Sequence, residues 1–479
     1  MLEPYQVEHN SQNIYYRSIV GAAEAGSRIR LGIRIRSYEP VRQVLVRLWQ
    51  DRTGERLIPL ETKDTGGEQR FYTCWFELPD YGCLLWYYFI ITMADETCFY
   101  GNNEEMLGGV GTLSNTAPAS YQITIYNKGA HTPDWFKNAV MYQIFPDRFA
   151  RSGDMIVRKK GAVIRTDWTD DPMYLKDPDT KEIIAYDFFG GNLRGVMEKL
   201  DYLQDLGISC IYFNPVFESE SNHHYDTGDY HKIDPMLGDI EDFRSLIAAA
   251  RERGIRIILD GVFSHTGSNS IYFNRQQQYH SLGAYQSKES PYYSWYRFRS
   301  YPNEYDCWWN FDTLPNVNET DPAYMDFVIT SEDSVLHHWM KEGIAGWRLD
   351  VIDELPPTFS KAFFAELKKS NPDAVMIGEV WEDASNKVAY GTPREYLSGN
   401  EMDSAMNYPL RTIWFDFLTG ASDGRQTARR LASQIENYPR ENLYAMMNLI
   451  SSHDVQRAIT VLAGVPYYEG MPAIEQSRV

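Results

Sequence analysis

The chain has 479 residues, 43% of them hydrophobic and 23% charged, which is typical of a globular protein with more than one domain. Acidic residues outnumber basic ones by 66 to 46, giving a net charge of −20. No basic surplus remains to neutralise phosphates, which argues against a nucleic-acid partner. The five cysteines are widely spaced and fit reduced thiols. With no signal-type N-terminus and no membrane-length apolar run, we expect a cytoplasmic protein without a membrane partner.

Residues 1–128 show the alternation of short β-strands and predict a β-sandwich domain. Turn residues separate the expected strands, which cover 29–35, 41–49, 71–76, 84–93 and 121–126. Trp49, Trp75 and Trp86 fall within this alternation, and we expect them to pack in the core. The segment Asn127–Pro133 is expected to be a linker.

Residues 134–479 alternate strands with helices, which predicts a parallel sheet with crossover helices. Helices are expected at 193–206, 240–253 and 358–369, and strands at 139–145, 208–213, 255–262, 344–349, 375–380 and 444–451. Strands of this kind, with 444–451 taken as the seventh, favour a (β/α)₈ TIM barrel within an α/β fold. No glycine-rich phosphate loop follows a strand, so the nucleotide-binding α/β folds lose their main support.

One connection is far longer than an ordinary loop. It lies between the third and fourth barrel strands, is rich in Tyr, Trp, Asn and Ser, and predicts an inserted subdomain at residues 266–340. About half of its candidate aromatic residues are expected to line sugar subsites and the rest to form a core. These residues are Tyr292, Tyr293, Trp295, Trp308 and Trp309.

Polar residues stand at the ends of four expected strands, where a parallel barrel forms its catalytic mouth. The four segments read DGVFSH (260–265), GWRLD (346–350), GEVW (378–381) and SHD (452–454). Singly, each carboxylate could be a helix N-cap and each histidine a structural residue. That explanation is inadequate for four carboxylates, two histidines and an arginine that occur together in this order.

These four segments resemble the signature regions of the α-amylase superfamily, glycoside hydrolase family 13. Supporting stretches are YQIFPDRF (142–149), YFNP (212–215), HYDTGDY (224–230) and LPNVN (314–318). Together with a sandwich at the N-terminus, they look like the neopullulanase, cyclomaltodextrinase and maltogenic amylase branch. The resemblance runs from about residue 139 to the end of the chain. It implies an α-glucan substrate.

The resemblance implies that Asp350 is the nucleophile, Glu379 the general acid/base and Asp454 the transition-state stabiliser. Retaining hydrolysis needs two carboxyl groups about 5–5.5 Å apart, one ionised and one protonated. Arg348 is expected to keep Asp350 ionised, and apolar neighbours to raise the pKa of Glu379. Tyr225 is expected to stack on the sugar, both histidines to donate to it as neutral groups, and Asp260 to bond to Arg348. The residues expected to bind substrate are Tyr225, Asp260, His265, Arg348, His453 and Trp381.

The expected activity is hydrolysis of α-glucosidic bonds in starch-type glucans, maltooligosaccharides, cyclodextrins or pullulan. A glucan transferase or debranching enzyme with the same triad remains an alternative, as does a non-catalytic carbohydrate-binding relative. No cofactor is required. Calcium stays optional, because Ala150–Asp154 lacks the Asn/Asp cluster that relatives use for calcium, and Asn192 replaces an acidic ligand of those relatives. The resemblance also implies a possible homodimer through the N-terminal domain.

The C-terminus of the chain carries a further expectation. After Asp454, helix is expected at 455–462 and a loop at 464–472, and the last residues hold no run suited to a buried strand. We therefore expect a barrel truncated before its eighth strand, in a fragment of a longer protein.

Overall fold

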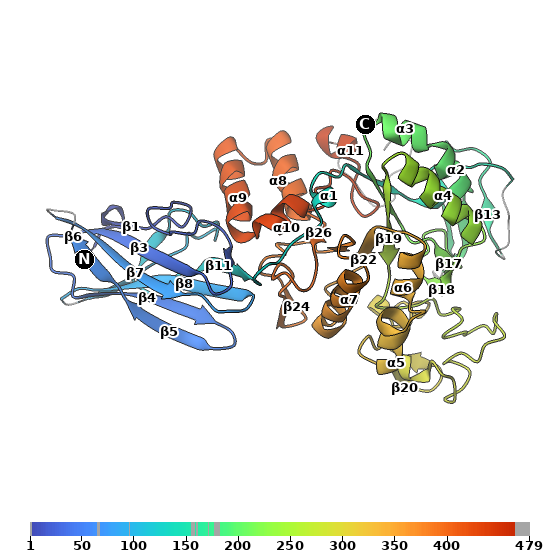
Figure 1. Ribbon diagram of the computed structural model, residues 1–479, viewed down its shortest axis with the longest axis horizontal. Helices are drawn as coiled ribbons and strands as arrows, with labels where there is room; N and C mark the ends of the chain where they lie inside the picture. The colour runs from blue at the N-terminus through green and yellow to red at the C-terminus, as the bar shows by residue number, and fades with distance from the viewer. Residues whose placement is uncertain are drawn as a thin grey trace. The chain divides into compact units, whose positions relative to one another are not determined.

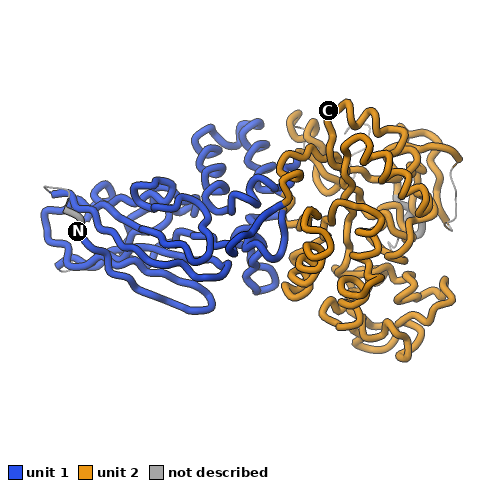
Figure 2. Tube along the Cα trace, in the orientation of Figure 1, with its two compact units in different colours: residues 1–132, 381–403, 407–449 blue, residues 133–380, 404–406, 450–479 orange. Residues whose placement is uncertain are grey.

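A computed structural model describes residues 2–64, 68–94, 96–154, 159, 161–170, 172–176 and 183–464. The chain divides into two compact units (Figure 2). We call Met1–Thr132, Trp381–Asp403 and Asn407–Leu449 the sandwich unit. Pro133–Val380, Ser404–Met406 and Ile450–Val479 form the parallel-sheet unit. Within the described ranges, no helix is both long and apolar enough to cross a membrane.

The N-terminal strands form two packed sheets, as the alternation predicts (Figure 1). One sheet has the order β1 (Val7–Glu8), β3 (Arg28–Arg36), β7 (Gln69–Glu77) and β6 (Glu61–Asp64). The other runs through β10 (Thr112–Ser114), β9 (Thr97–Gly101), β8 (Cys83–Thr92), β11 (Tyr121–Tyr126) and β2 (Ala23–Glu24), with β4 (Gln43–Gln50) joining β8 to β5 (Gly54–Pro59). Alternate residues of both sheets point inward and form one apolar core.

The prediction of core tryptophans is wrong for Trp49 and Trp75, and Trp86 is only partly buried, at an outward position of β8. Trp49 is 37% exposed and Trp75 is 49% exposed. Both occupy outward positions of their strands, because their neighbours Leu48, Cys74 and Phe76 take the inward positions. Alternation along a strand means that neighbouring side chains point to opposite faces of the sheet, but it does not show which face packs on the core.

The sandwich unit also contains three helices from late in the chain: α8 (Tyr408–Leu418), α9 (Gly424–Asn437) and α10 (Arg440–Ala445). Helix α9 packs on β11, where the Thr124 hydroxyl donates to the carbonyl of Asn437 at 2.6 Å. A short hairpin, β24 (Val388–Ala389) and β25 (Thr392–Pro393), completes this part. The strand predicted at 444–451 is wrong, because α10 begins directly after Pro439 and covers the first two of those residues.

The parallel-sheet unit is built on six parallel strands, an open half-barrel in the described residues. Their order is that of the chain: β12 (Met141–Ile144), β16 (Cys210–Phe213), β19 (Arg256–Gly261), β22 (Gly346–Leu349), β23 (Val375–Gly378) and β26 (Ser404–Ala405). Five were predicted, and each predicted range is two or three residues longer in total than the observed strand. The sixth, β26, is two residues long and has no apolar run to reveal it. The closed eight-stranded barrel stays a prediction, and residues 465–479 lie outside the described part.

Crossover helices link these strands. Helix α4 (Ile240–Glu252) shows why the prediction succeeded, because the side chain of Asp239 caps it and its apolar face is buried against β19. The helix predicted at 193–206 is instead α2 (Leu193–Glu198) and α3 (Leu200–Asp205), interrupted at Lys199. The remaining helices are α1 (Asp134–Lys137), α6 (Val335–Lys341), α7 (Pro357–Ser370) and α11 (Ala458–Leu462).

Shorter elements complete the unit. Two hairpin strands, β17 (Phe217–Ser219) and β18 (Thr227–Ile233), follow β16, and β13 (Val163–Ile164), β14 (Tyr174–Lys176) and β15 (Ile183–Phe188) precede it. Between β19 and β22 lie η3 (Tyr293–Trp295), β20 (Phe298–Ser300), β21 (Glu304–Tyr305), η4 (Trp308–Asn310), α5 (Pro322–Met325) and η5 (Asp326–Thr330). These elements occupy the long connection that the sequence predicted.

Candidate active site

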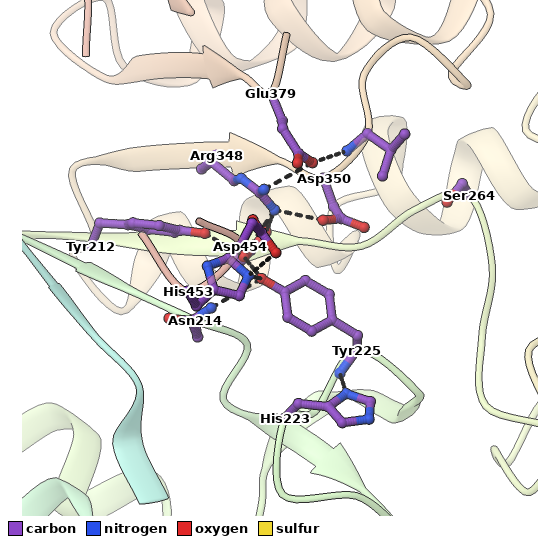
Figure 3. Close-up of polar contacts among 12 residues, drawn as sticks. Tyr212, Asn214, His223, Tyr225, Ser264, Arg348, Asp350, Glu379, His453 and Asp454 are labelled. Carbon is purple, nitrogen blue, oxygen red and sulfur yellow. Dashed lines mark hydrogen bonds and ion pairs between the residues drawn. The ribbon is translucent and has the colours of Figure 1, made fainter. Parts of the chain in front are cut away.

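Three neighbouring strands of the half-barrel bring charged side chains together at their carboxyl ends (Figure 3). Asp260 of β19 and Arg348 of β22 are partners in register, and their side chains bond at 2.8 and 3.1 Å. The same guanidinium contacts Asp350 at 2.6 Å and Glu379 at 2.8 Å. Arg348 is fully buried, so one cation holds three buried carboxyl groups.

The backbone after the nucleophile candidate adds a contact to this cluster. Val351 has φ 39°, a left-handed conformation that a β-branched side chain strongly disfavours. Its N–H donates to Oε2 of Glu379 at 2.8 Å. Strain of this kind persists only where the surrounding structure holds it, and it gathers at functional sites. The turn therefore places Glu379 next to the residue that follows Asp350.

Burial and mutual repulsion set the protonation of these carboxyl groups. Burial raises the pKa of Asp350, Arg348 opposes the shift, and Glu379 and Asp260 add to it. Burial likewise raises the pKa of Asp454 to about 6, with Glu379 contributing and Arg348 opposing. Four carboxyl groups facing one guanidinium favour the retention of a proton by one of them. Such a site can contain an ionised nucleophile beside a protonated acid.

The two histidines predicted to bind substrate differ in their surroundings. His453 is the neighbour of Asp454, at 3.4 Å from Oδ1, and its ring stacks on Tyr225 with centroids 5.6 Å apart. His265 is buried; its Nε2 donates to the Tyr225 carbonyl at 3.1 Å, and its Nδ1 accepts from Ser264 at 3.0 Å. Burial lowers the pKa of His265 to about 4 and that of His453 to about 3, so both are neutral at pH 7. Sugar binding by either remains a prediction.

The two aromatic residues predicted to bind substrate fall in different units. Tyr225 belongs to the parallel-sheet unit, and its hydroxyl donates to Asp260 at 2.9 Å. Trp381 begins a segment of the sandwich unit and stacks on Tyr408, with centroids 4.0 Å apart and an interplanar angle of 4°. Contact of Trp381 with substrate stays a prediction.

Sequence reasoning assigned no role to three polar residues that the structure places in the site. Tyr212, on β16, donates to Asp260 at 2.5 Å. Asn214 follows the same strand and bonds to the Tyr225 hydroxyl, and Gln143 of β12 bonds to His453. Each stands at the carboxyl end of its strand, within a stretch that carries the family resemblance. Their position at these strand ends was the signal that could have revealed them.

The aromatic residues of the long connection divide between packing and exposure. Trp295 is buried among Tyr272, Tyr324 and Phe327. Trp309 is 70% exposed, and Trp308 tilts over His265 with centroids 5.4 Å apart. Tyr293 stacks on Phe298, and Tyr292 lies edge-on to Trp295. A role for any of them in sugar subsites remains a prediction.

One residue weighed for calcium, Asn192, has a structural role. Oδ1 of Asn192 accepts from the N–H groups of Gly195 and Ser152, which makes it the cap of α2. Across the described residues, no cluster of three or more His, Cys, Asp or Glu side chains could hold a metal ion. The optional role of calcium remains a prediction.

Comparison with known proteins agrees with this geometry. Residues 143–469 match the family model described as alpha amylase, catalytic domain. The match spans the strands that supply the carboxyl cluster and extends past His453 and Asp454. The chain therefore belongs to the alpha-amylase family.

The chain is similar to several relatives whose names state an activity. An amylopullulanase from Thermoanaerobacter thermohydrosulfuricus is 35% identical over 501 residues, which cover 95% of this chain and 33% of the relative. Neopullulanase 2 from Thermoactinomyces vulgaris is 35% identical over 334 residues, covering 70% of this chain and 53% of the relative. The chain thus spans about a third of the first relative's length and about half of the second's.

Solved structures show the same fold. The type III pullulan hydrolase from Thermococcus kodakarensis aligns over 98% of this chain and 77% of its own, with a TM-score of 0.60 and 26% identity. A cyclic alpha-maltosyl-(1→6)-maltose hydrolase from Arthrobacter globiformis aligns over 70% of each chain, with a TM-score of 0.59 and 31% identity. The half-barrel is thus part of an alpha-amylase family fold.

Proposed function

We propose that the protein hydrolyses α-glucosidic bonds with retention of configuration, through a covalent glycosyl-enzyme intermediate. The observation that carries the proposal is the guanidinium of Arg348, which contacts Asp350 at 2.6 Å and Glu379 at 2.8 Å. Sharing one cation holds the two carboxyl groups close together, as double displacement requires. Inverting hydrolysis needs a wider gap, because a water molecule must fit between the carboxyl group and the sugar.

In the first step, a carboxylate oxygen of Asp350 forms a bond to the anomeric carbon. The glycosidic oxygen leaves with a proton from Glu379. In the second step, Glu379 takes a proton from water, whose oxygen attacks the anomeric carbon and releases Asp350. Asp454 stabilises the positive charge that develops on the sugar ring. Arg348 keeps Asp350 ionised when Glu379 is protonated, because the two groups compete for its charge.

The names of the relatives support starch-type glucans, pullulan and cyclodextrins as substrates. The neopullulanase, amylopullulanase and cyclomaltodextrinase relatives are each at least 35% identical to this chain. Dimerisation through the N-terminal sandwich belongs to the same proposal, and the outward-facing Trp49 on one sheet or Trp75 on the other offers apolar surface for it. A glucan transferase would use the same two carboxyl groups, with a sugar hydroxyl replacing water in the second step.

The substitution Glu379→Gln tests the acid role. It should slow hydrolysis of maltooligosaccharides by about a hundred-fold or more, because their sugar leaving group needs protonation. An aryl α-glucoside with an activated leaving group should be slowed far less in the glycosylation step, measured as kcat/KM. Initial rates on both substrates provide the comparison.

Glu366→Gln is the matched control, since Glu366 on α7 is partly buried and pairs with Lys369 and His337, outside the carboxyl cluster. This variant should retain the wild-type rate on both substrates. Equal losses on both substrates in Glu379→Gln would show that Glu379 is not the acid. Starch, pullulan and cyclodextrin all left uncut by the wild-type protein would favour a binding-only relative.

A further inference from the structure

Four side chains beside the carboxyl cluster form a closed ring of hydrogen bonds. Nε2 of Gln143 lies 2.9 Å from Oδ1 of Asn214 and 2.7 Å from Nδ1 of His453. The Tyr225 hydroxyl lies 3.0 Å from Nδ2 of Asn214 and 2.7 Å from Nε2 of His453. Figure 3 shows Asn214, Tyr225 and His453 meeting at one point below Arg348. The members come from four separate parts of the chain, so the ring depends on the tertiary fold.

The direction of each bond follows from Asp260. Oδ2 of Asp260 accepts from the Tyr225 hydroxyl at 2.9 Å and from Tyr212 at 2.5 Å, and Arg348 donates to both carboxylate oxygens. Every partner of this carboxylate is a donor, so it needs no proton of its own. The single hydroxyl proton of Tyr225 is therefore directed to Asp260.

The rest of the ring must then donate toward Tyr225. Asn214 does so with its amide N–H, which leaves its Oδ1 to accept from Gln143. His453 does so with a proton on Nε2, which leaves Nδ1 to accept from the second N–H of Gln143. The NH₂ group of Gln143 thus fixes the orientation of the Asn214 amide and the tautomer of His453. With both amides reversed, the lone proton of Tyr225 would have to serve three acceptors at once.

We propose that Gln143 and Asn214 are positioning residues that hold His453 as the neutral tautomer with its proton on Nε2. The ring also aligns the His453 and Tyr225 rings, which are 7° from parallel. A proton on Nδ1 would face an N–H of Gln143, so the ring disfavours the imidazolium form. The charged or titratable groups nearest His453 are Arg348, Glu379, Asp454 and His223. The effect of this ring on catalysis rests on the proposed function, whereas the tautomer of His453 does not.

The test is long-range ¹H–¹⁵N NMR of protein labelled with ¹⁵N-histidine, with His453 assigned from the signal lost in His453→Gln. In the wild type, His453 should show a proton on Nε2 alone throughout pH 5 to 8. In Gln143→Glu, the carboxylate accepts at both positions and demands a proton on Nδ1, so His453 should titrate within that range. A wild-type His453 that carries its proton on Nδ1, or titrates between pH 5 and 8, would overturn the proposal.

Activity provides the second readout. Gln143→Glu should lower kcat/KM by roughly ten- to a hundred-fold and change its pH profile, as loss of an orienting partner does at other sites. Gln204→Glu on α3 makes the same chemical change outside the ring and should behave as wild type. An unaltered His453 spectrum in folded Gln143→Glu would contradict the proposal, and if this variant does not fold, the wild-type spectrum decides. If the protein cleaves no α-glucan while His453 carries its proton on Nε2, the proposed function is wrong and this inference still holds.

Discussion

Asp350→Ala should lower the rate of α-glucan hydrolysis by at least about a thousand-fold, since no covalent intermediate can form without its carboxylate. The residue sits at the end of β22, where its backbone N–H donates to the Gly261 carbonyl at 3.0 Å. Alanine keeps that backbone contact. We therefore expect the melting temperature to change little or to rise, because a buried charge that Arg348 only partly compensates is removed.

Initial rates on maltooligosaccharides, measured with thermal melts of the same preparations, check this expectation. Asp326→Ala, at the start of η5, is the control for carboxylate loss elsewhere in the same unit and should retain activity. A folded Asp350→Ala variant with more than about a hundredth of the wild-type rate would rule Asp350 out as the nucleophile.

Arg348→Met should be the most destabilising substitution in the site. It removes the cation that contacts Asp260, Asp350 and Glu379, all of them buried. Loss of the cation from a buried ion cluster costs about 3–5 kcal/mol, because the carboxylates around it are left uncompensated. Activity should fall with it, since nothing then holds the Asp350 carboxylate ionised.

The loss should depend on pH in a definite direction. Burial already raises the folded-state pKa values of Asp260 and Asp350, and loss of Arg348 raises them further above their unfolded values. The variant therefore loses stability as pH rises and regains it as pH falls. Urea unfolding at pH 5 and pH 8 measures this difference. Arg253→Met, which breaks the 2.7 Å surface pair with Asp201, should cost less than about 1 kcal/mol. A cost for Arg348→Met as small as that would show that the cluster is not held by this cation.

Local patterns predicted much of this fold. The strand alternation of residues 29–35 and the apolar face of α4 with its Asp239 cap are properties of neighbouring residues, and the structure has both. The carboxyl cluster was also within reach, because strand-end motifs place side chains at one edge of a parallel sheet. Arg348 and Asp260 follow that rule as partners in register on neighbouring strands.

What could not be predicted depends on contacts between distant segments. The run 444–451 has the composition of a strand, but its first two residues form the end of α10. The outward direction of Trp49 depends on which face of its sheet is covered. The ring through Gln143 and His453 joins residues 310 positions apart, and no local pattern records such a pair.

The anomeric configuration of the first product is the most direct test of the central claim. Proton NMR during the first minutes of maltooligosaccharide hydrolysis separates the two anomers before they interconvert. Double displacement through Asp350, with Glu379 as acid and base, predicts that the α-anomer is released first. Initial release of the β-anomer would contradict the account, because it would mean a single displacement by water.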